Sequence, residues 1–283
     1  MRILHRLFVF AFLVCLSHSS TAQKTTKPIS PYRKGMFSVY WGWNRSHYTK
    51  STLHFTGDDY DFKLYKVIAK DRQSPFDPAI YFNPTRMTIP QYNFRIGYFI
   101  TDRYQLSIGA DHMKYVMQSN QDVKINGEIH QSGTVYDGVY SNDTIKIRPD
   151  FLLFEHTDGL NYENIECRRF EPLFVRKHFS IAASEGVGIG VLVPRTNTTL
   201  LNNARYDEFH VAGYGLNAVV ALNLSFFKYF FIQAECKGGF IHMPDIRTTM
   251  NPADRASQAF FFSQYNVVFG FNFKIPGLPR EGI

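Results

Sequence analysis

Residues 261–273 read FFSQYNVVFGFNF. From Tyr265 to Phe273 every second side chain is apolar or aromatic, and the side chains between them are mainly amides and glycine. Successive side chains of a β-strand point to opposite faces, so this period of two predicts a strand with one apolar and one polar face. An aromatic-rich final strand of this kind favours a sheet whose outer face is apolar.

The same alternation recurs along the chain and predicts eight strands: residues 35–47, 88–101, 104–117, 158–172, 178–193, 208–224, 229–243 and 259–274. Two of them are irregular. Glu185 falls on the apolar parity of its strand, which predicts a β-bulge there. In the 158–172 strand the parity switches near Asn164.

The connections between these strands alternate strictly between short and long. Short ones lie around residues 102–103, 175–177 and 227–228, and long ones span residues 48–87, 118–157, 194–207 and 244–258. A soluble β-sandwich would turn its polar face outward, and its loops need not alternate in length. The pattern therefore predicts an all-β, transmembrane, antiparallel up-and-down barrel of about eight strands, with long extracellular loops and both termini periplasmic.

Two of the long loops carry alternating apolar residues of their own. Leu53 to Ile68, around Gly57-Asp58-Asp59, predicts a β-hairpin, and Val123 to Ile129, around Asn126-Gly127, predicts a second. Such hairpins would extend the barrel outward, which makes loops 48–87 and 118–157 the candidate contact sites for an extracellular ligand.

The amino terminus predicts secretion. A basic start is followed by an apolar run at residues 7–16 and by small residues up to Ala22, the order of a signal peptide. We expect cleavage after residue 22, a periplasmic segment at 23–34, the barrel at 35–275 and a tail at 276–283. Removing Arg2 and Arg6 lowers the formal net charge from +7 to about +5. No run of Lys and Arg is dense enough to predict nucleic-acid binding.

Aromatic residues are abundant, with 27 Phe and 17 Tyr. A membrane barrel places such rings outside, in two girdles at the bilayer interfaces. We assign Trp41 and Trp43 to the girdle at the outer interface. Phe271 and Phe273, on the last strand, are also assigned to an aromatic girdle.

Charged residues on the polar parity are predicted to face the lumen. These are Arg95, Asp111, Glu235 and Lys237, with Glu163 as a further candidate. Charges of both signs in a narrow lumen are costly unless they pair. The first interpretation is an ion-pair plug that closes the barrel, and the alternative is a gated pore opened by an exchange of partners.

A second group lies near the predicted extracellular ends of the strands: His112, Asp158, Ser46 and His47. A histidine beside a carboxylate and a hydroxyl can act as a general base, and enzymes that modify lipid A acyl chains use barrels of this size. The simpler interpretation is that histidine is an amphipathic ring suited to a membrane interface. No metal site or cofactor is predicted. Cys167 and Cys236 are two thiols that pair only if the fold makes them adjacent.

Several segments resemble outer-membrane β-barrel proteins of the Bacteroidetes type: the Thr-Ala-Gln end of the signal, Tyr-Trp-Gly-Trp-Asn-Arg at 40–45, Asp-His-Met-Lys-Tyr at 111–115, Gly-Asp-Asp-Tyr-Asp-Phe at 57–62 and Asp-Gly-Leu-Asn-Tyr at 158–162. The strand count is similar to that of small OmpA/OmpX-type barrels. The resemblance implies an outer-membrane location, with membrane lipid, lipopolysaccharide and the barrel-assembly machinery as partners. It implies no catalytic residues.

The sequence thus favours an integral outer-membrane barrel without enzymatic activity, in a structural or surface-interaction role. An enzyme acting on outer-leaflet lipid and a narrow gated pore for ions or small solutes are the two alternatives.

Overall fold

The computed structural model describes residues 30–83 and 85–275 of the 283-residue chain. The predicted signal peptide (1–22), most of the predicted periplasmic segment (23–29) and the tail (276–283) lie outside the described residues. Within those residues, no helix has the length and hydrophobicity needed to span a bilayer.

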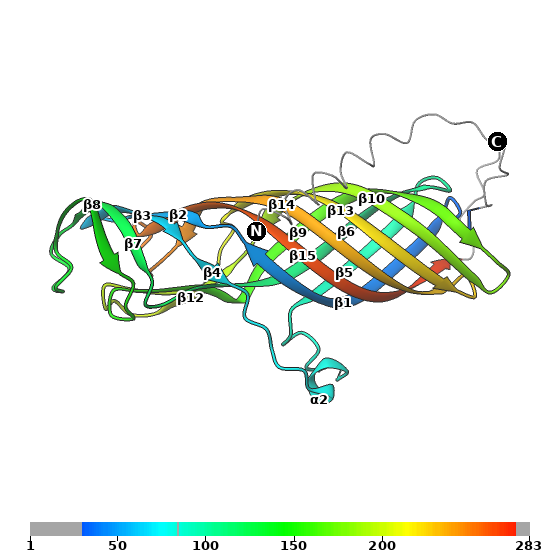
Figure 1. Ribbon diagram of the computed structural model, residues 1–283, viewed down its shortest axis with the longest axis horizontal. Helices are drawn as coiled ribbons and strands as arrows, with labels where there is room; N and C mark the ends of the chain where they lie inside the picture. Colours follow the sequence, from blue (N-terminus) through cyan, green and yellow to red (C-terminus); the bar gives the residue numbers. More distant parts are fainter. Residues whose placement is uncertain (1–29, 84, 276–283) are drawn as a thin grey trace.

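Eight antiparallel strands close into a ring in which the first strand pairs with the last (Figure 1). In order around the ring they are β1 (Met36–Tyr48), β5 (Tyr92–Phe99), β6 (Tyr104–Met117), β9 (Leu152–Val175), β10 (Phe179–Leu192), β13 (Gly213–Phe226), β14 (Phe230–Arg247) and β15 (Arg255–Lys274). The predicted eight-stranded up-and-down barrel is confirmed.

The short connections, at residues 100–103, 176–178 and 227–229, all lie at one end of the barrel, which we call the turn end. At the other, loop end, the long connections fold into further strands: β2 (Ser51–Thr56), β3 (Tyr60–Val67), β4 (Ala69–Lys70), β7 (Asp122–Ile129), β8 (Gly138–Lys146), β11 (Arg195–Leu200) and β12 (Tyr206–Phe209). Together with the loop-end parts of the barrel strands they form the extension. A one-turn helix, α2 (Pro78–Tyr81), projects from the side of the barrel (Figure 1).

The first predicted hairpin is present as β2 and β3, which pair directly. The second is wrong in its turn, because β7 runs straight through Asn126-Gly127 and reverses only at residues 130–137. Gly127 has a φ of +119°, and a Cβ there would lie 2.6 Å from the Phe62 Cα. This glycine therefore serves the close approach of β7 to β3, and not a turn.

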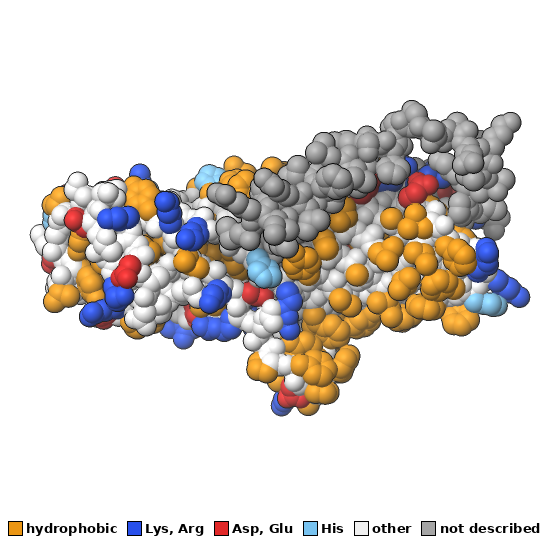
Figure 2. All heavy atoms as spheres, in the orientation of Figure 1, with side chains coloured by type: hydrophobic (Ala, Val, Ile, Leu, Met, Phe, Trp, Pro, Cys, Tyr) orange, Lys and Arg blue, Asp and Glu red, His pale blue; other side chains and the backbone are white. Residues whose placement is uncertain are grey.

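The outer face of the turn-end half is an apolar belt (Figure 2). Val187 is 64% exposed and Leu216 is 49% exposed, whereas Asn217 between two such outward positions is only 6% exposed. The predicted inward and outward parities of β13 are therefore confirmed.

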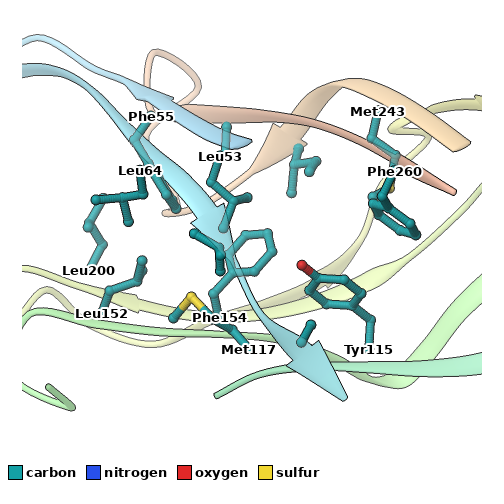
Figure 3. Close-up of a cluster of buried hydrophobic side chains, with 14 of the residues drawn as sticks. Leu53, Phe55, Leu64, Tyr115, Met117, Leu152, Phe154, Leu200, Met243 and Phe260 are labelled. Atoms are coloured by element: carbon teal, nitrogen blue, oxygen red, sulfur yellow. The ribbon is translucent and has the colours of Figure 1, made fainter. Parts of the chain in front are cut away.

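The interior changes chemistry along the barrel while the strand geometry stays constant. On β15, Gln264 and Asn266 face inward in the turn-end half, and Phe260 and Phe262 face inward nearer the loop end, all on one parity. The inward residues of the extension form one large apolar core (Figure 3). It is drawn from β2, β3, β4, β6, β7, β9, β10, β11, β14 and β15 and includes Leu53, Phe55, Leu64, Tyr115, Met117, Leu152, Phe154, Leu200, Met243 and Phe260.

This change of interior explains two incorrect predictions. The parity of β9 does not switch near Asn164, because Leu160 and Glu166 both face inward; Leu160 belongs to the apolar core and Glu166 to the polar lumen. Glu163 is consequently exposed on the outer wall and does not join the lumen.

Glu185 marks no bulge. It keeps the outward parity of β10 and lies 3.4 Å from Arg169 on the outer wall of β9. The irregularity between β9 and β10 comes at Ile181 and Ala182, opposite Pro172. Proline has no backbone N–H to offer to a ladder, which makes its neighbourhood a natural place for a register shift.

Candidate functional site

Six charged side chains fill the lumen of the turn-end half, and each is at most 2% exposed. They come from four strands: Arg95 on β5, Asp111 on β6, Glu166 and Arg168 on β9, and Glu235 and Lys237 on β14. The group, which we call the ion cluster, contains three cations and three anions.

Glu166 is the centre of the ion cluster. Its Oε1 lies 3.1 Å from Arg95 Nη2 and 2.8 Å from Lys237 Nζ, and its Oε2 lies 2.6 Å from Arg168 Nη2. Asn217 donates a further hydrogen bond of 3.0 Å to Oε1. One carboxylate thus binds all three cations of the lumen.

The other two carboxylates each hold one cation and several neutral donors. Glu235 Oε1 lies 2.6 Å from Arg168 Nη1, and Glu235 Oε2 accepts a 2.9 Å hydrogen bond from Asn266 Nδ2. Asp111 Oδ2 lies 2.5 Å from Lys237 Nζ and accepts a 3.0 Å hydrogen bond from Asn164 Nδ2.

A tyrosine hydroxyl joins the two arginines. Tyr40 Oη accepts hydrogen bonds of 3.1 Å from both Arg95 Nε and Arg168 Nη2, and it donates to Glu235 at 3.2 Å. Bringing an ion out of water costs several kcal/mol, and that cost is offset only when charges and hydrogen bonds are fully matched. Here opposite charges are equal in number, so the ion cluster is matched as a unit and leaves no surplus charge for a solute.

The lumen is also closed on both sides of the ion cluster. Toward the turn end, Tyr32 enters the barrel from the chain that precedes β1, stacks on Phe99 with ring centroids 4.8 Å apart, and donates a 3.2 Å hydrogen bond to Asn223. The void between Tyr32 and Arg168 measures about 10 Å³, roughly the room for one water. Toward the loop end, the apolar core fills the interior.

A larger pocket of about 520 Å³ opens at the turn end and is lined by Met36, Phe179 and Phe273 among others. None of the six side chains of the ion cluster lines it. The pocket is therefore the turn-end mouth of the barrel. It does not continue past Tyr32 to the ion cluster.

All four of the predicted lumen residues, Arg95, Asp111, Glu235 and Lys237, lie in the ion cluster, but only Asp111 and Lys237 pair with each other. Arg95 binds Glu166 and Glu235 binds Arg168, two residues that the sequence analysis missed. Their signal was the spacing Tyr162, Asn164, Glu166, Arg168, which places four polar groups on one face of a strand. Leu160 on the same parity concealed it, because it suggested that this face was the apolar one.

The predicted rim residues are not brought together. Ser46 faces into the barrel, is 2% exposed, and donates from its hydroxyl to Asn44 at 3.4 Å. His112 lies on the outer wall, where its ring stacks on Tyr92 and its Nδ1 lies 2.8 Å from Asn161 Oδ1.

The wall of the barrel thus separates the hydroxyl from the imidazole. Asp158 binds Arg195 at 3.2 Å, and the exposed His47 lies against the ring of Tyr265. Within residues 30–83 and 85–275, no hydrogen bond or ion pair links any two of Ser46, His47, His112 and Asp158.

Aromatic contacts run around the outside of the turn end. Phe273 stacks on Phe37, and Phe271 contacts Phe230. The row continues through further rings on seven strands in all, with Tyr98, Phe226, Phe179 and Phe174 as the other members. At the opposite border of the belt, Trp41 stacks on Tyr92 with centroids 4.4 Å apart, and Trp43 contacts Phe269.

Cys167 and Cys236 are both free thiols. In the part of the chain that the structure describes, no three His, Cys, Asp or Glu side chains gather where they could hold a metal ion.

No protein-family model matches the sequence, and a comparison with curated proteins finds no match. Among solved structures, the chain is similar to the outer membrane protein OprG from Pseudomonas aeruginosa, at 10% identity and a TM-score of 0.44, over 87% of this chain and 100% of that one. It is similar to the outer membrane protein AlkL in lipid bilayers, at 10% identity and a TM-score of 0.38, over 93% and 100% of the two chains. It is also similar to Ail, the attachment invasion locus protein of Yersinia pestis, at 10% identity and a TM-score of 0.32, over 85% and 99%.

Proposed function

We propose that this protein is an integral outer-membrane barrel with a permanently closed lumen and no catalytic activity, which acts structurally and through the surface of its extension. The observation that carries the proposal is the ion cluster. Its charges are matched within the lumen, and both Tyr32 and the apolar core close the same path.

The membrane assignment is supported by the exterior. Side chains such as Ile108 (62% exposed) and Val267 (57% exposed) would be poorly placed in water, and the row of aromatic rings at the turn end matches the girdle of a membrane barrel. We place the turn end and both termini on the periplasmic side of the membrane, and the extension on the extracellular side.

The partners that follow are outer-membrane lipid and lipopolysaccharide around the belt, the barrel-assembly machinery during insertion, and a ligand on the extension, for which loops 48–87 and 118–157 are the candidate contact sites. The Bacteroidetes-type origin rests on the sequence segments quoted above and belongs to the same proposal. The separation of Ser46 from His112 lends no support to an enzyme, and the filled lumen lends none to a pore.

Single-channel recording of the refolded protein in planar bilayers tests the closed lumen. We expect a flat current trace while voltage and pH are varied, because the ion cluster leaves no unpaired charge for a permeating ion and the lumen on both sides of it is filled. Release of a small trapped dye from proteoliposomes gives the same test without applied voltage. Reproducible current steps, with insertion verified by heat-modifiable migration on gels, would contradict the proposal.

A further inference from the structure

One segment of the first long loop leaves the extension and lies against the outer wall of the barrel. We call residues 72–83 and 85–90, which carry α2, the side paddle. In Figure 1 it hangs from the flank of the barrel beside the loop-end part of β1, and in Figure 2 its hydrophobic surface continues into that of the barrel.

The contacts of the side paddle fix its height along the barrel. Its Tyr81 and Phe82 rings contact Trp43, with centroid distances of 5.6 and 5.5 Å. On the outward face of β1, Phe37, Val39, Trp41 and Trp43 form the apolar series, and Arg45 is the first charge beyond them. The aromatic rings of the side paddle therefore pack on the belt side of Arg45.

A second strand gives the same border. On β6 the outward side chains are uncharged from Leu106 onward, and Lys114 is the first charged one. Its Nζ donates a 3.0 Å hydrogen bond to the Ile89 carbonyl at the end of the side paddle. Arg45 and Lys114, which have the carboxylates of Asp71 and Asp158 near them, thus mark the level at which charged side chains begin on the outer wall.

The free surface of the side paddle carries large apolar side chains, together with two exposed charged residues near its tip, Asp77 and Arg86. Phe76 is 68% exposed, Phe82 is 64% exposed and Ile89 is 50% exposed. Phe82 contacts Trp43 and Phe76, yet both phenylalanine rings keep about two thirds of their surface exposed. So much exposed apolar surface is costly in water, whereas aromatic rings are favoured at the interfaces of a membrane barrel.

The segment is locally ordered without help from a protein partner. Asp77 caps α2 by accepting from the Ala79 N–H at 2.9 Å, and the Tyr81 hydroxyl donates to the Ser74 carbonyl at 2.8 Å. Asn83 accepts from the Thr85 N–H at 3.0 Å. Backbone groups that are satisfied within the segment lower the cost of placing it among lipid chains.

We propose that the side paddle is a lipid anchor, which inserts Phe76 and Phe82 among the acyl chains of the outer leaflet beside β1 and β5. The inference rests on the proposed membrane location of the barrel. Its physical basis is that the apolar surface of the side paddle continues into the apolar belt of the barrel. The two surfaces meet on the turn-end side of Arg45 and Lys114.

Spin-label accessibility in liposomes tests the anchor. The background carries Cys167→Ser and Cys236→Ser, and single labels are placed at Phe82→Cys or Phe76→Cys. Val187→Cys in the belt and Val135→Cys in the β7–β8 turn (64% and 89% exposed in the native chain) are the matched references. We expect the labels at 82 and 76 to resemble that at 187, with greater access to oxygen than to a water-soluble nickel complex, and the label at 135 to show the reverse.

Two other outcomes are distinguishable. Nickel access at 82 and 76 equal to that at 135, with 187 still protected, would overturn the anchor and leave the membrane barrel intact. Nickel access at 187 itself would overturn the membrane assignment, and the anchor with it.

Discussion

At the scale of single residues, neighbours in the sequence have opposite environments. Arg168 is buried in the ion cluster, whereas Arg169 on the outer wall forms partly exposed ion pairs with Glu171 and Glu185. This contrast makes the two arginines a natural pair for measuring what the lumen contributes to stability.

We expect Arg168→Ala to lower the free energy of unfolding by about 3–5 kcal/mol, because it leaves Glu166 and Glu235 buried with fewer partners. Arg169→Ala should cost less than about 1 kcal/mol, as partly exposed ion pairs do. Urea titration of the refolded protein in lipid, followed by gel migration, gives both values. Equal losses of unfolding free energy in the two variants would mean that the ion cluster is not a matched unit.

His156 gives the extension a dependence on pH. It is fully buried in the extension, its Nδ1 lies 3.0 Å from Thr196 Oγ1, and burial lowers its pKa to about 3. Since the pKa in the folded state lies below the unfolded value of about 6.5, the stabilisation is complete above pH 6.5 and is lost as pH falls toward 3, at about 1.4 kcal/mol per pH unit.

Hydrogen exchange of the β2, β3 and β11 amides measures this effect. Exchange should be faster at about pH 4.5 than at about pH 7 after correction for the intrinsic rate, and His156→Gln should reduce the difference. An unchanged difference in the variant would assign the acid sensitivity to other groups.

At the scale of elements, the alternation of apolar and polar residues predicted which segments are strands, and most of them lie where expected. It failed where the interior changes from polar to apolar, because the same inward face of β9 carries Leu160 at one level and Glu166 at another. Strands β11 and β12 were not predicted, and residues 208–209 belong to β12 and not to β13. Four of the six members of the ion cluster could be predicted from the sequence. Glu166 and Arg168 were missed because Leu160, on the same parity of β9, suggested that this face was the apolar one. The pairing among the six depends on register across the lumen, which sequence spacing does not give.

Gly127 tests the packing of the extension. Gly127→Ala should destabilise the β3–β7 pairing by more than about 2 kcal/mol, because the added Cβ collides with the Asp61 carbonyl and Phe62 while φ is +119°. Gly133→Ala is the control: its φ is +68°, but a Cβ there meets nothing within 4 Å, so only a backbone cost of about 1 kcal/mol is expected. Limited proteolysis of the extension ranks the two; similar rates would show that steric contact is not the cause.

At the scale of the whole molecule, three closures lie in series along one axis: the buried apolar group around Tyr32 and Phe99, the ion cluster, and the apolar core of the extension. A path through the barrel would require all three to open. The belt, the turn-end aromatic rings and the side paddle share the outer surface, so the inside and the outside of the barrel can be altered separately.

Series closure predicts that Tyr32→Ala remains non-conducting in planar bilayers, even though loss of its ring contacts with Phe99 and Phe170 should cost about 3 kcal/mol of stability. The ion cluster and the apolar core still block the path. Current steps in this variant alone would show that Tyr32 is the only effective seal.

The pairing of the first strand with the last has a consequence for biogenesis. In the proposed orientation, the chain between β1 and β5, and between β6 and β9, lies outside the cell, and the filled cylinder of the finished barrel offers it no route. We therefore infer that these segments cross the bilayer before the β1–β15 seam joins. β15 also receives β2 from the first long loop, so the final strand completes the transmembrane wall and the outer hairpins at once. In that orientation, we expect insertion to end when the β1–β15 seam closes, because no route for exporting the protein's own loops remains afterwards.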